Sequence, residues 1–337
     1  MAADRNSKTI VIAGASSLLG NELKSLLEES RFASWDLQLV DEDVAAGTLT
    51  VAGGEPAVIQ KIDEDTFRGA RFALLAGSRA FSKRSLAPAK EAGAIVADFS
   101  GTTLSDPDAI PWFPKIQAVT GKTVPKSGRV FCVFSAGGTA IASLALALKK
   151  LDIQRLVAVI YWPVSESGRE GIEELETQTS QLLSFQPIGH RIFGTQTAFN
   201  LLPAYGADSR YALQDRLLST RAEVSAAIGD PVDDAKVSLN LIHVPVFYGT
   251  TFNICVDLSS DVSGEALAEA CEEAGFSVVL ETEGGPSNVS VAGETSLYLR
   301  APTPDSNHPK SWWLWGAADN LRVPAHSGIK LAEWLDS

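Results

Sequence analysis

The sequence predicts an α/β protein whose first domain has a doubly wound parallel sheet and whose second domain has a mixed sheet. Three observations predict this fold. The chain has 337 residues, which is too long for one ordinary domain and fits two. Its N-terminal part alternates short apolar runs with helical segments, and its later part has more strand-like runs than crossover helices.

The N-terminal part reads as strands followed by helices. A buried strand is expected over Lys8 to Ala13, where a β-branched run ends at a glycine, and the helical segment NELKSLLEES comes after the next loop. Further strands are expected at Asp36 to Val40, Arg71 to Ala76 and Ala94 to Phe99, with a helix through SKRSLAPAKEAG before the last of them. Strands and helices that alternate at this spacing require parallel crossovers, so a Rossmann-type domain is expected over residues 1–133.

The sequence changes character beyond Phe131. A Gly137-Gly138 turn leads into a long apolar helix, TAIASLALALKKL. Because strands then outnumber crossover helices, we expect a mixed or antiparallel sheet that is covered on one face. The expected strands are Arg155 to Tyr161, Val237 to His243, Thr251 to Leu258 and Ser296 to Arg300, and the expected helices are 170–184, 208–228 and 264–274.

This second domain is expected over residues 134–319. The uncovered face of its sheet must also be buried, and pairing with a second copy of the chain is the usual solution, so a homodimer is expected. A final helix is expected to begin near Ser327 and to return to the first domain, which then also includes residues from about 320 to 337.

The composition excludes several classes of function. Hydrophobic residues make up 45% of the chain and charged residues 20%, which favours a folded core over disorder. The net charge is −13 and basic residues form no run, which argues against nucleic acid or an anionic membrane as partner. The three cysteines and four histidines have no metal-ligand spacing. No export segment precedes the first strand, and no apolar stretch approaches the ~20 residues that span a bilayer, so a cytoplasmic protein is expected.

A glycine-containing loop follows the first strand and opens a helix, which is the context of a dinucleotide-binding motif. Gly14 would allow the tight turn, and Gly20 would let the helix pack close to the sheet. Backbone amides near Ser16 and Leu18 would face a pyrophosphate at the helix N-terminus. The middle position is Ser17, whose hydroxyl could bind a phosphate or whose Cβ could crowd it. The alternative is a strand–helix turn without a ligand.

Two further positions belong to this candidate cofactor site. Asp41 closes the second strand, where a carboxylate can bind the ribose 2′-hydroxyl and would repel a 2′-phosphate. If NAD or NADP binds, Asp41 therefore favours NAD; the alternative is that residues 41–43 form a solvated acidic turn. Gly77, which follows the third strand, is the remaining candidate for contact with the dinucleotide.

Five segments along nearly the whole chain carry a family resemblance, namely Phe67 to Ser100, Gly168 to Thr179, Ala198 to Pro203, Val244 to Thr251 and Asp319 to Arg322. They resemble segments of the aspartate-semialdehyde dehydrogenase family and recur in the order of that family. The resemblance implies NADP-dependent reduction of aspartyl phosphate to aspartate semialdehyde, or the reverse. It also implies a cysteine that forms a thioacyl intermediate, a histidine that moves the proton, and arginines that hold the substrate.

The chain departs from this family at the residues that carry the chemistry. Aligning the helix after the Gly-Gly turn puts Thr139 at the position of the nucleophilic cysteine. The histidine of the family should directly follow the glycine of VPVFYG, and that position is Thr250. Neither side chain has a pKa near neutrality. We interpret Thr139 as a helix cap and Cys132, in the strand VFCVF, as a small apolar residue. The arginine expected after Asp98-Phe99-Ser100 is also missing.

Two residues remain as candidates for substrate binding. His243 stands where the family usually has an arginine, so it is either poised at that site or satisfied by a hydrogen bond at the strand end. Arg221 is the candidate for a retained carboxylate-binding residue. Glu173, Glu174 and Gln178 lie where the family orients its substrate, or else on an exposed helix face.

These losses are correlated, so we expect the chain to be a family relative without the family activity, kept as a dimeric binding or structural protein. The alternative is an NAD(P)-dependent oxidoreductase with a different substrate and mechanism. A third reading is the family activity itself, carried by a residue that this alignment misses.

Overall fold

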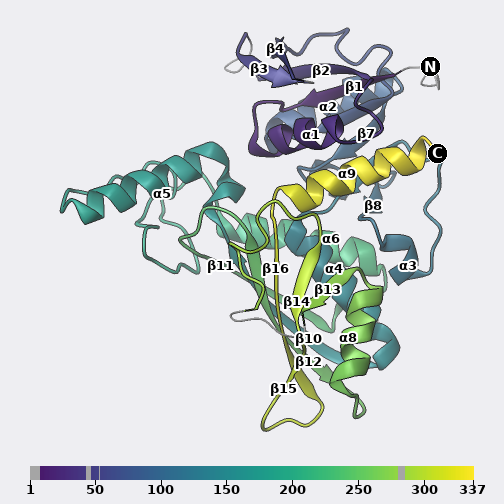
Figure 1. The fold of residues 1–337 in the computed structure, drawn as a ribbon, viewed down its shortest axis with the longest axis vertical. Helices are drawn as coiled ribbons and strands as arrows, with labels where there is room; N and C mark the ends of the chain where they lie inside the picture. The colour runs from purple at the N-terminus through teal and green to yellow at the C-terminus, as the bar shows by residue number, and fades with distance from the viewer. Residues whose placement is uncertain (1–7, 43–46, 53, 280–284) are drawn as a thin grey trace. The chain divides into compact units, whose positions relative to one another are not determined.

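The computed structural model describes residues 8–42, 47–52, 54–279 and 285–337. The chain divides into two compact units, and each is described here by itself (Figure 1). Unit 1 consists of Met1–Gln117, Lys122–Phe134 and Pro324–Ser337, and unit 2 consists of Ala118–Gly121 and Ser135–Val323. No helix among the described residues has the length and apolar character needed to cross a membrane.

Unit 1 is built on a sheet in which every neighbouring pair of strands is parallel, as predicted. The sheet has the order β5-β2-β1-β6-β7-β9-β8. After β1 the chain adds β2 and β5 on one side, and it then adds β6 and β7 on the other side of β1, so the direction of strand addition reverses between β1 and β6. Such a reversal is the place where α/β sheets bind ligands, beyond the carboxyl ends of the strands. The strands are β1 (Thr9–Ala13), β2 (Asp36–Asp41), β5 (Gln60–Lys61), β6 (Phe72–Leu75), β7 (Ile95–Asp98), β8 (Ile110–Trp112) and β9 (Val130–Val133).

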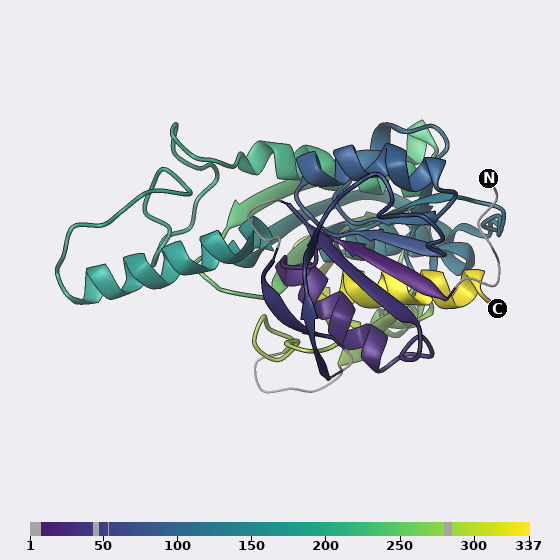
Figure 2. The same ribbon diagram turned by 90° about the horizontal axis from the view of Figure 1, so that it is seen from above.

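Helices cover both faces of this sheet, which explains why β6, β7 and β9 are buried at every residue. Figure 2 shows α1 and α2 on opposite sides of the sheet. The hairpin formed by β3 (Leu49–Ala52) and β4 (Glu55–Val58) was not predicted. The helices of this part of the chain are α1 (Leu18–Glu28), α2 (Arg79–Glu91), the 3₁₀ helix η1 (Thr102–Ser105), α3 (Ile116–Thr120) and α9 (Arg322–Leu335).

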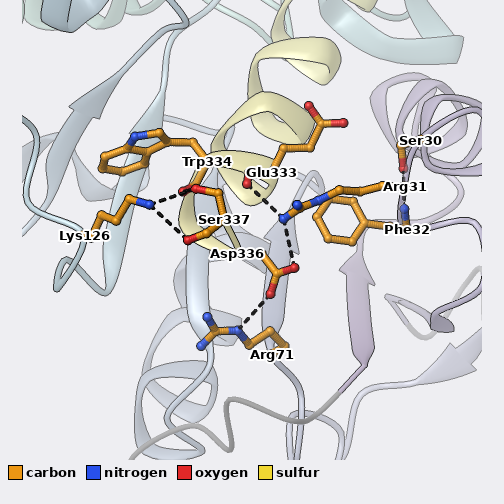
Figure 3. Close-up of polar contacts among 9 residues, drawn as sticks. All are labelled: Ser30, Arg31, Phe32, Arg71, Lys126, Glu333, Trp334, Asp336 and Ser337. Atoms are coloured by element: carbon orange, nitrogen blue, oxygen red, sulfur yellow. Dashed lines mark hydrogen bonds and ion pairs between the residues drawn. The ribbon is translucent and has the colours of Figure 1, made fainter.

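The last helix, α9, begins earlier than the predicted Ser327, because Asp319 accepts hydrogen bonds from the amides of Leu321 and Arg322 and so caps a helix that starts at Arg322. Its C-terminal end is held within unit 1 by basic side chains, as Figure 3 shows. Arg31 donates to the Asp336 carboxylate at 2.9 Å, and Lys126 donates to the Ser337 hydroxyl at 2.8 Å.

Unit 2 is built on a mixed sheet, which confirms the second part of the predicted fold. The order is β11-β10-β12-β16-β14-β13, with β15 paired to β16; β10–β11 and β13–β14 are parallel, and the other pairs are antiparallel. The strands β13, β15 and β16 were not predicted. The strands are β10 (Ile153–Trp162), β11 (Val237–His243), β12 (Thr250–Leu258), β13 (Phe276–Val279), β14 (Leu297–Arg300), β15 (Thr303–Pro304) and β16 (Ser311–Ala318).

Alternate residues of β10, β12 and β16 face opposite sides of this sheet, and the two sides differ in burial. One side packs beneath α4 and includes the fully buried Ile160 and Phe252. The other side, which we call the open face, is partly exposed and consists of Val157, Val159, Tyr161, Asn253, Cys255, Trp313 and Trp315. The helices of unit 2 are α4 (Ala136–Leu148), η2 (Lys149–Leu151), η3 (Val164–Ser167), α5 (Gly168–Leu183), α6 (Leu213–Ile228), α7 (Pro231–Asp234) and α8 (Gly264–Glu273).

Glu174 and Gln178 lie on the buried side of α5, so the exposed-face interpretation is wrong for these two residues, whereas Glu173 is exposed. The Glu174 carboxylate accepts hydrogen bonds from the amides of Ile192 and Phe193, at 2.6 and 3.1 Å. The Gln178 side chain accepts from the amide of Thr197 at 2.7 Å and donates to nearby carbonyls. Both side chains therefore hold the loop after α5 in place.

Candidate functional site

The loops that follow β1 and β6 touch each other at the reversal point of the unit 1 sheet. Gly14 has a φ of +98°, and a Cβ at this position would lie 2.2 Å from the Gly77 nitrogen. A Cβ at Gly20 would lie 2.3 Å from the Gly14 carbonyl oxygen. Gly14 has a left-handed backbone conformation, and neighbouring backbone atoms leave no space for a Cβ at either Gly14 or Gly20. Only glycine therefore fits at these two positions. These close approaches hold the loop after β1 against the loop after β6 and against the start of α1.

Ser17 is the N-cap of α1, and its hydroxyl is engaged on two sides. The Oγ atom accepts a hydrogen bond from the Gly20 amide at 2.8 Å and donates one to the Ala76 carbonyl at 2.9 Å. The hydroxyl therefore ties the loop to the end of β6. Leu18 is the first residue of α1, and Ser16 is exposed beside it. Helix amides at such an N-terminus suit a phosphate, so these residues fit a dinucleotide.

Asp41 is 6% exposed, so the solvated-turn interpretation is wrong for this residue, while Asp43 lies outside the described residues. One carboxylate oxygen accepts a hydrogen bond from the Ser16 amide at 2.7 Å, and the other accepts from the Glu42 amide at 2.8 Å. Asp41 therefore braces the glycine loop and puts a buried negative charge at the end of β2. The fold brings together all the predicted loop residues, namely Gly14, Ser16, Ser17, Leu18, Gly20, Asp41 and Gly77.

The first turn of α4 in unit 2 carries a buried carboxylate. Ser135, not Thr139, is the N-cap, so the predicted cap was placed four residues too late. Glu223 of α6 accepts hydrogen bonds from the Ser135 hydroxyl at 2.6 Å and from the Ser135 amide at 3.2 Å. A Cβ at Gly138 would lie 1.8 Å from the Glu223 Oε2 atom. The positive end of the α4 dipole therefore faces the Glu223 carboxylate, which is 5% exposed.

Thr139 lies inside this turn, 4% exposed, and its hydroxyl has no hydrogen-bond partner in the described structure. Thr250, at the start of β12, is fully buried, and its hydroxyl likewise has no partner there. A buried polar atom without a partner is uncommon, and strain, an ordered water or ion, or a catalytic role can explain it. Unit 2 thus places such atoms at both positions where the resemblance implies catalytic side chains.

His243, the last residue of β11, is fully buried and is paired with Leu202 through both backbone hydrogen bonds. Its Nδ1 atom lies 3.1 Å from the Tyr205 hydroxyl, and its Nε2 atom has no partner among the described residues. Burial lowers the pKa of His243 to about 4, so the imidazole is neutral at pH 7.

A further acidic group lies at the same end of the sheet, in η3 directly after β10. Burial of the Glu166 carboxyl raises its pKa to about 7, although Arg216 and a hydrogen bond from Asn320 both act to lower the pKa. The Asn320 side chain also accepts from the Gly249 amide at 2.8 Å and donates to Ser165 at 3.0 Å. Sequence reasoning missed Glu166 and Asn320; the available signal was a charged residue inside the otherwise buried run Val164 to Ser167.

Arg221 is already paired. Its guanidinium donates to the Asp234 carboxylate at 2.6 Å and to the Asp234 carbonyl at 2.9 Å. The turn after β7 in unit 1, where an arginine was missing, is held by Asp98, which accepts from the amides and hydroxyls of Ser100 and Thr103. Arg79 of α2 approaches this turn, with its guanidinium 3.5 Å from the Gly101 carbonyl oxygen.

None of the three cysteines belongs to the first turn of α4. Cys132 is in β9 and 2% exposed, and Cys271 is fully buried in α8, where burial raises the pKa of its thiol to about 12. Cys255 is in β12, on the open face, and burial is the main cause that raises its pKa. Within the described residues, no cluster of three or more potential metal-binding side chains is found.

Two family models match this chain, one over its N-terminal part and one over its C-terminal part. Residues 9–123 match the family described as "Semialdehyde dehydrogenase, NAD binding domain", and residues 144–323 match "Semialdehyde dehydrogenase, dimerisation domain". The chain is 28% identical to a USG-1 protein homolog of Azotobacter vinelandii and 27% identical to an aspartate-semialdehyde dehydrogenase of Rickettsia bellii, each over 97% of both chains.

Solved structures agree with these sequence matches. The structure of a probable aspartate-semialdehyde dehydrogenase from Pseudomonas aeruginosa superposes with a TM-score of 0.86 at 25% identity, covering 98% of both chains. Aspartate semialdehyde dehydrogenase II from Vibrio cholerae superposes with a TM-score of 0.83 at 22% identity, covering 97% of this chain and 98% of the other.

Proposed function

The chain belongs to the semialdehyde dehydrogenase family, and we propose that it is a dinucleotide-binding, dimeric member that does not carry out the thioester chemistry of that family. The observation that carries this proposal is the pair formed by Ser135 and Glu223 at the start of α4.

The start of α4 is unsuited to a thiolate. A helix N-terminus lowers the pKa of a thiol by favouring its anion. Here the neighbouring side chain is Thr139, and the carboxylate of Glu223 already receives the stabilisation of the helix end. A threonine hydroxyl is not ionised near neutral pH, and the neutral hydroxyl of Thr250 cannot exchange a proton in the way that an imidazole can. The acyl-transfer step therefore has neither a nucleophile nor a proton carrier at these positions.

A nicotinamide dinucleotide fits the loop in unit 1. The backbone amides at the start of α1 would hold the pyrophosphate, and Gly14 and Gly20 allow the tight turn and close backbone packing that position these amides. The charge of Asp41 at the end of β2 favours the ribose 2′-hydroxyl of NAD over the 2′-phosphate of NADP. When bound, the nicotinamide supplies hydride transfer. The residues of this chain contribute the binding and its selectivity.

The open face of unit 2 is the surface that we assign to the dimer. It presents Val159, Tyr161 and Trp315 side by side, and the rings of the last two lie 5.9 Å apart. The segment around the end of α5 adds exposed apolar side chains, with Leu183 at 70% and Phe185 at 98% exposure. Figure 1 shows α5 extending away from the sheet of unit 2. Aromatic and apolar side chains of this kind are typical of subunit interfaces.

The cofactor part is tested by thermal-shift titration with NAD, NADH, NADP and NADPH, because a ligand that binds only the folded state raises the melting temperature. We expect the NAD forms to raise the melting temperature at lower concentrations than the NADP forms. The absence of a shift with all four compounds would refute this part of the proposal.

A second candidate function is an NAD(P)-dependent oxidoreductase with another substrate and mechanism. Glu166 favours it, because a carboxyl with a pKa of about 7 can exchange protons at neutral pH. A screen of small aldehydes and alcohols, followed by the absorbance of the reduced nicotinamide, separates the two. Turnover that is lost in Glu166→Gln, while dinucleotide binding is kept, would support this second function.

A further inference from the structure

We propose that unit 1 contains a ligand site distinct from the cofactor loop, a cavity that binds an organic ammonium ion with an apolar body. The cavity is lined by residues from the C-terminal end of α1, the loop after it, the starts of β1 and β2, and the β3–β4 hairpin. Its volume is about 300 Å³, which is enough for a small molecule. The inference goes beyond the proposed function, because it requires neither a dinucleotide nor unit 2.

The cavity lies at the opposite end of the unit 1 sheet from the glycine loop. Ile10, the second residue of β1, and Leu37, the second residue of β2, both line it, and these two residues are paired in the parallel register. The glycine loop instead follows the carboxyl ends of β1 and β6. Because the two ends of a strand lie at opposite edges of a sheet, a ligand in the cavity leaves the dinucleotide site free.

Two aromatic rings in the loop after α1 provide a rigid wall. The ring of Phe32, which is 2% exposed, meets the ring of Trp35 edge to face at 4.8 Å. Trp35 also stacks on Phe72 at 6.1 Å, and its amide donates to the Phe32 carbonyl at 2.9 Å. Trp35 is thus held in place while it remains partly exposed and lines the cavity. Such rings attract both apolar groups and cations.

The charged side chains that line the cavity are all acidic. Glu28 is the last residue of α1, Asp36 is the first of β2 and Glu55 is the first of β4, and all three are exposed. Among the described residues that line the cavity there is no lysine, arginine or histidine. A cleft with charges of one sign and partly apolar walls focuses the electrostatic potential. The cavity therefore attracts cations and repels anions.

The end of α1 adds to this negative potential. The negative end of a helix dipole is stabilised by basic side chains, but the last turn of α1 contains none and ends in Glu28. Leu27 and Glu28 bring this helix end to the cavity. An acidic residue at this place opposes the dipole, and a bound cation would offset the unfavourable interaction.

The nearest basic side chains are engaged elsewhere. Arg31, in the loop after α1, donates to the C-terminal end of α9, as Figure 3 shows. Lys24, one turn before Glu28, is 5% exposed and donates to the Thr50 hydroxyl at 2.7 Å. Lys24 offsets part of the charge of Glu28, whereas Glu55 has no basic partner at ion-pair distance in the described part of the chain. A cationic ligand would supply this missing positive charge.

The lining selects one class of ligand. A neutral apolar ligand would take water away from the carboxylates without replacing it. A divalent cation needs several oxygen ligands that converge, and within the described residues these carboxylates do not form such a group. An ammonium ion on a short aromatic or alkyl body suits both parts of the lining. Its body would contact Phe32 and Trp35, and its charge would lie beside Glu28 and Glu55.

The test is a saturation-transfer NMR titration of the whole protein with phenylethylammonium. Phenylethanol serves as the neutral counterpart, and phenylpropionate as the anionic one. We expect the ammonium ion to bind about tenfold more tightly than the alcohol, and phenylpropionate not to bind. Raising the salt concentration from about 20 mM to about 500 mM should weaken binding of the ammonium ion only. Addition of NAD should not displace it.

Variants separate the charge from the aromatic wall. Glu55→Gln should weaken ammonium binding about threefold, and the double variant Glu28→Gln, Glu55→Gln about tenfold, with the affinity for phenylethanol unchanged. Glu64→Gln, at an exposed carboxylate of unit 1 outside the cavity, is the matched control and should bind like the wild type. Trp35→Leu should weaken binding of both ligands, because both bodies lose the aromatic wall.

Four results would overturn the proposal: no saturable binding of phenylethylammonium, equal affinity for the ammonium ion and the alcohol, wild-type affinity in the double variant, or displacement by NAD. Should Trp35→Leu fail to fold by circular dichroism, the carboxylate variants still decide, because they change exposed side chains only. If NAD does not raise the melting temperature, the cofactor part of the proposed function fails, and the ammonium site stands or falls on its own titration.

Discussion

The carboxylate of Glu223 accepts hydrogen bonds from both the hydroxyl and the amide of Ser135, at 2.6 and 3.2 Å. This pair joins α6 to the first turn of α4 and puts a buried negative charge at a helix N-terminus. Gly138 completes the arrangement, because no side chain fits between the helix and the carboxylate. A turn that the resemblance assigns to a thiolate is thus a carboxylate-binding turn in this chain.

The first prediction concerns this pair. Gly138→Ala should destabilise the protein by about 1–3 kcal/mol, because its Cβ would lie 1.8 Å from the Glu223 Oε2 atom. The matched control is Gly137→Ala, whose Cβ would meet only the Ile160 side chain at 3.3 Å, and it should cost less. Urea unfolding of both variants provides the comparison. Equal stability of the two variants would show that Glu223 does not hold this position.

The second prediction concerns the cofactor loop. Asp41→Asn should reduce the preference for NAD over NADP by about tenfold, because it removes the charge that repels a 2′-phosphate while keeping an acceptor for the Ser16 amide. Asp36→Asn, at the exposed other end of β2, is the control and should leave the preference unchanged. Dissociation constants from fluorescence titration with the four nicotinamide dinucleotides provide the measurement. An unaltered preference in Asp41→Asn would remove the argument for NAD.

The third prediction concerns stability against pH. The folded pKa of His243, about 4, lies below its usual 6.5, so its contribution to stability is present above pH 6.5 and is lost as the pH falls toward 4. The folded pKa of Glu166, about 7, lies above its usual 4.5, so its contribution is present below pH 4.5 and is lost as the pH rises toward 7. The two effects oppose each other between pH 4.5 and 6.5.

Single variants should therefore separate these two effects. In this pH window Glu166→Gln should become more stable with rising pH, and His243→Gln should become less stable, each by about 1–3 kcal/mol over the window. Denaturant unfolding of both variants at pH 4.5, 5.5 and 6.5 measures the slopes. Parallel slopes in the two variants would mean that at least one of these groups titrates normally.

The fourth prediction concerns the dimer. Val159→Asp should yield a monomer, because it puts a charge in the middle of the open face of unit 2. Val232→Asp, at a residue of α7 that is 71% exposed, is the control and should leave the dimer intact. Sedimentation velocity at micromolar concentration distinguishes the two states.

Thiol labelling of Cys255 provides a second readout of the dimer. Cys255 lies on the open face, while Cys132 and Cys271 are buried. A thiol reagent should therefore label Cys255 faster in the monomer than in the dimer. If Val159→Asp remains a dimer, the subunit interface does not lie on the open face of unit 2.

Much of the fold could be predicted from the sequence because its signals are local. The runs that became β1, β6 and β7 are short and apolar, those of β1 and β7 are also β-branched, and each is followed by a turn and a helix. The strand β16 was missed because tryptophans alternate along it between buried Trp312 and exposed Trp313, a pattern that does not distinguish core from interface. The hairpin β3–β4 was missed because each of its strands has only four residues and is largely exposed, so the alternation of Leu49, Thr50 and Val51 is too short to distinguish a strand from a loop.

The candidate site was predicted less completely, because its partners are distant in sequence. Ser17 and Asp41 could be named from the strand–loop–helix context, but the bond from Ser17 to Ala76 could not. The partner of Ser135 is 88 residues away, and a glutamate within a helix gives no sign that it reaches another helix. Glu166 was missed for a similar reason, since its altered pKa depends on burial by distant elements of unit 2.

The central claim is that this protein binds a nicotinamide dinucleotide without performing acyl transfer. The most direct test incubates the wild-type protein with aspartate semialdehyde, phosphate and NAD or NADP, and follows both nicotinamide reduction and the intact protein mass. We predict no reduction above the rate without protein and no acyl adduct, in samples whose melting temperature is raised by the dinucleotide. Phosphate-dependent reduction together with an acyl adduct on the protein would contradict the account.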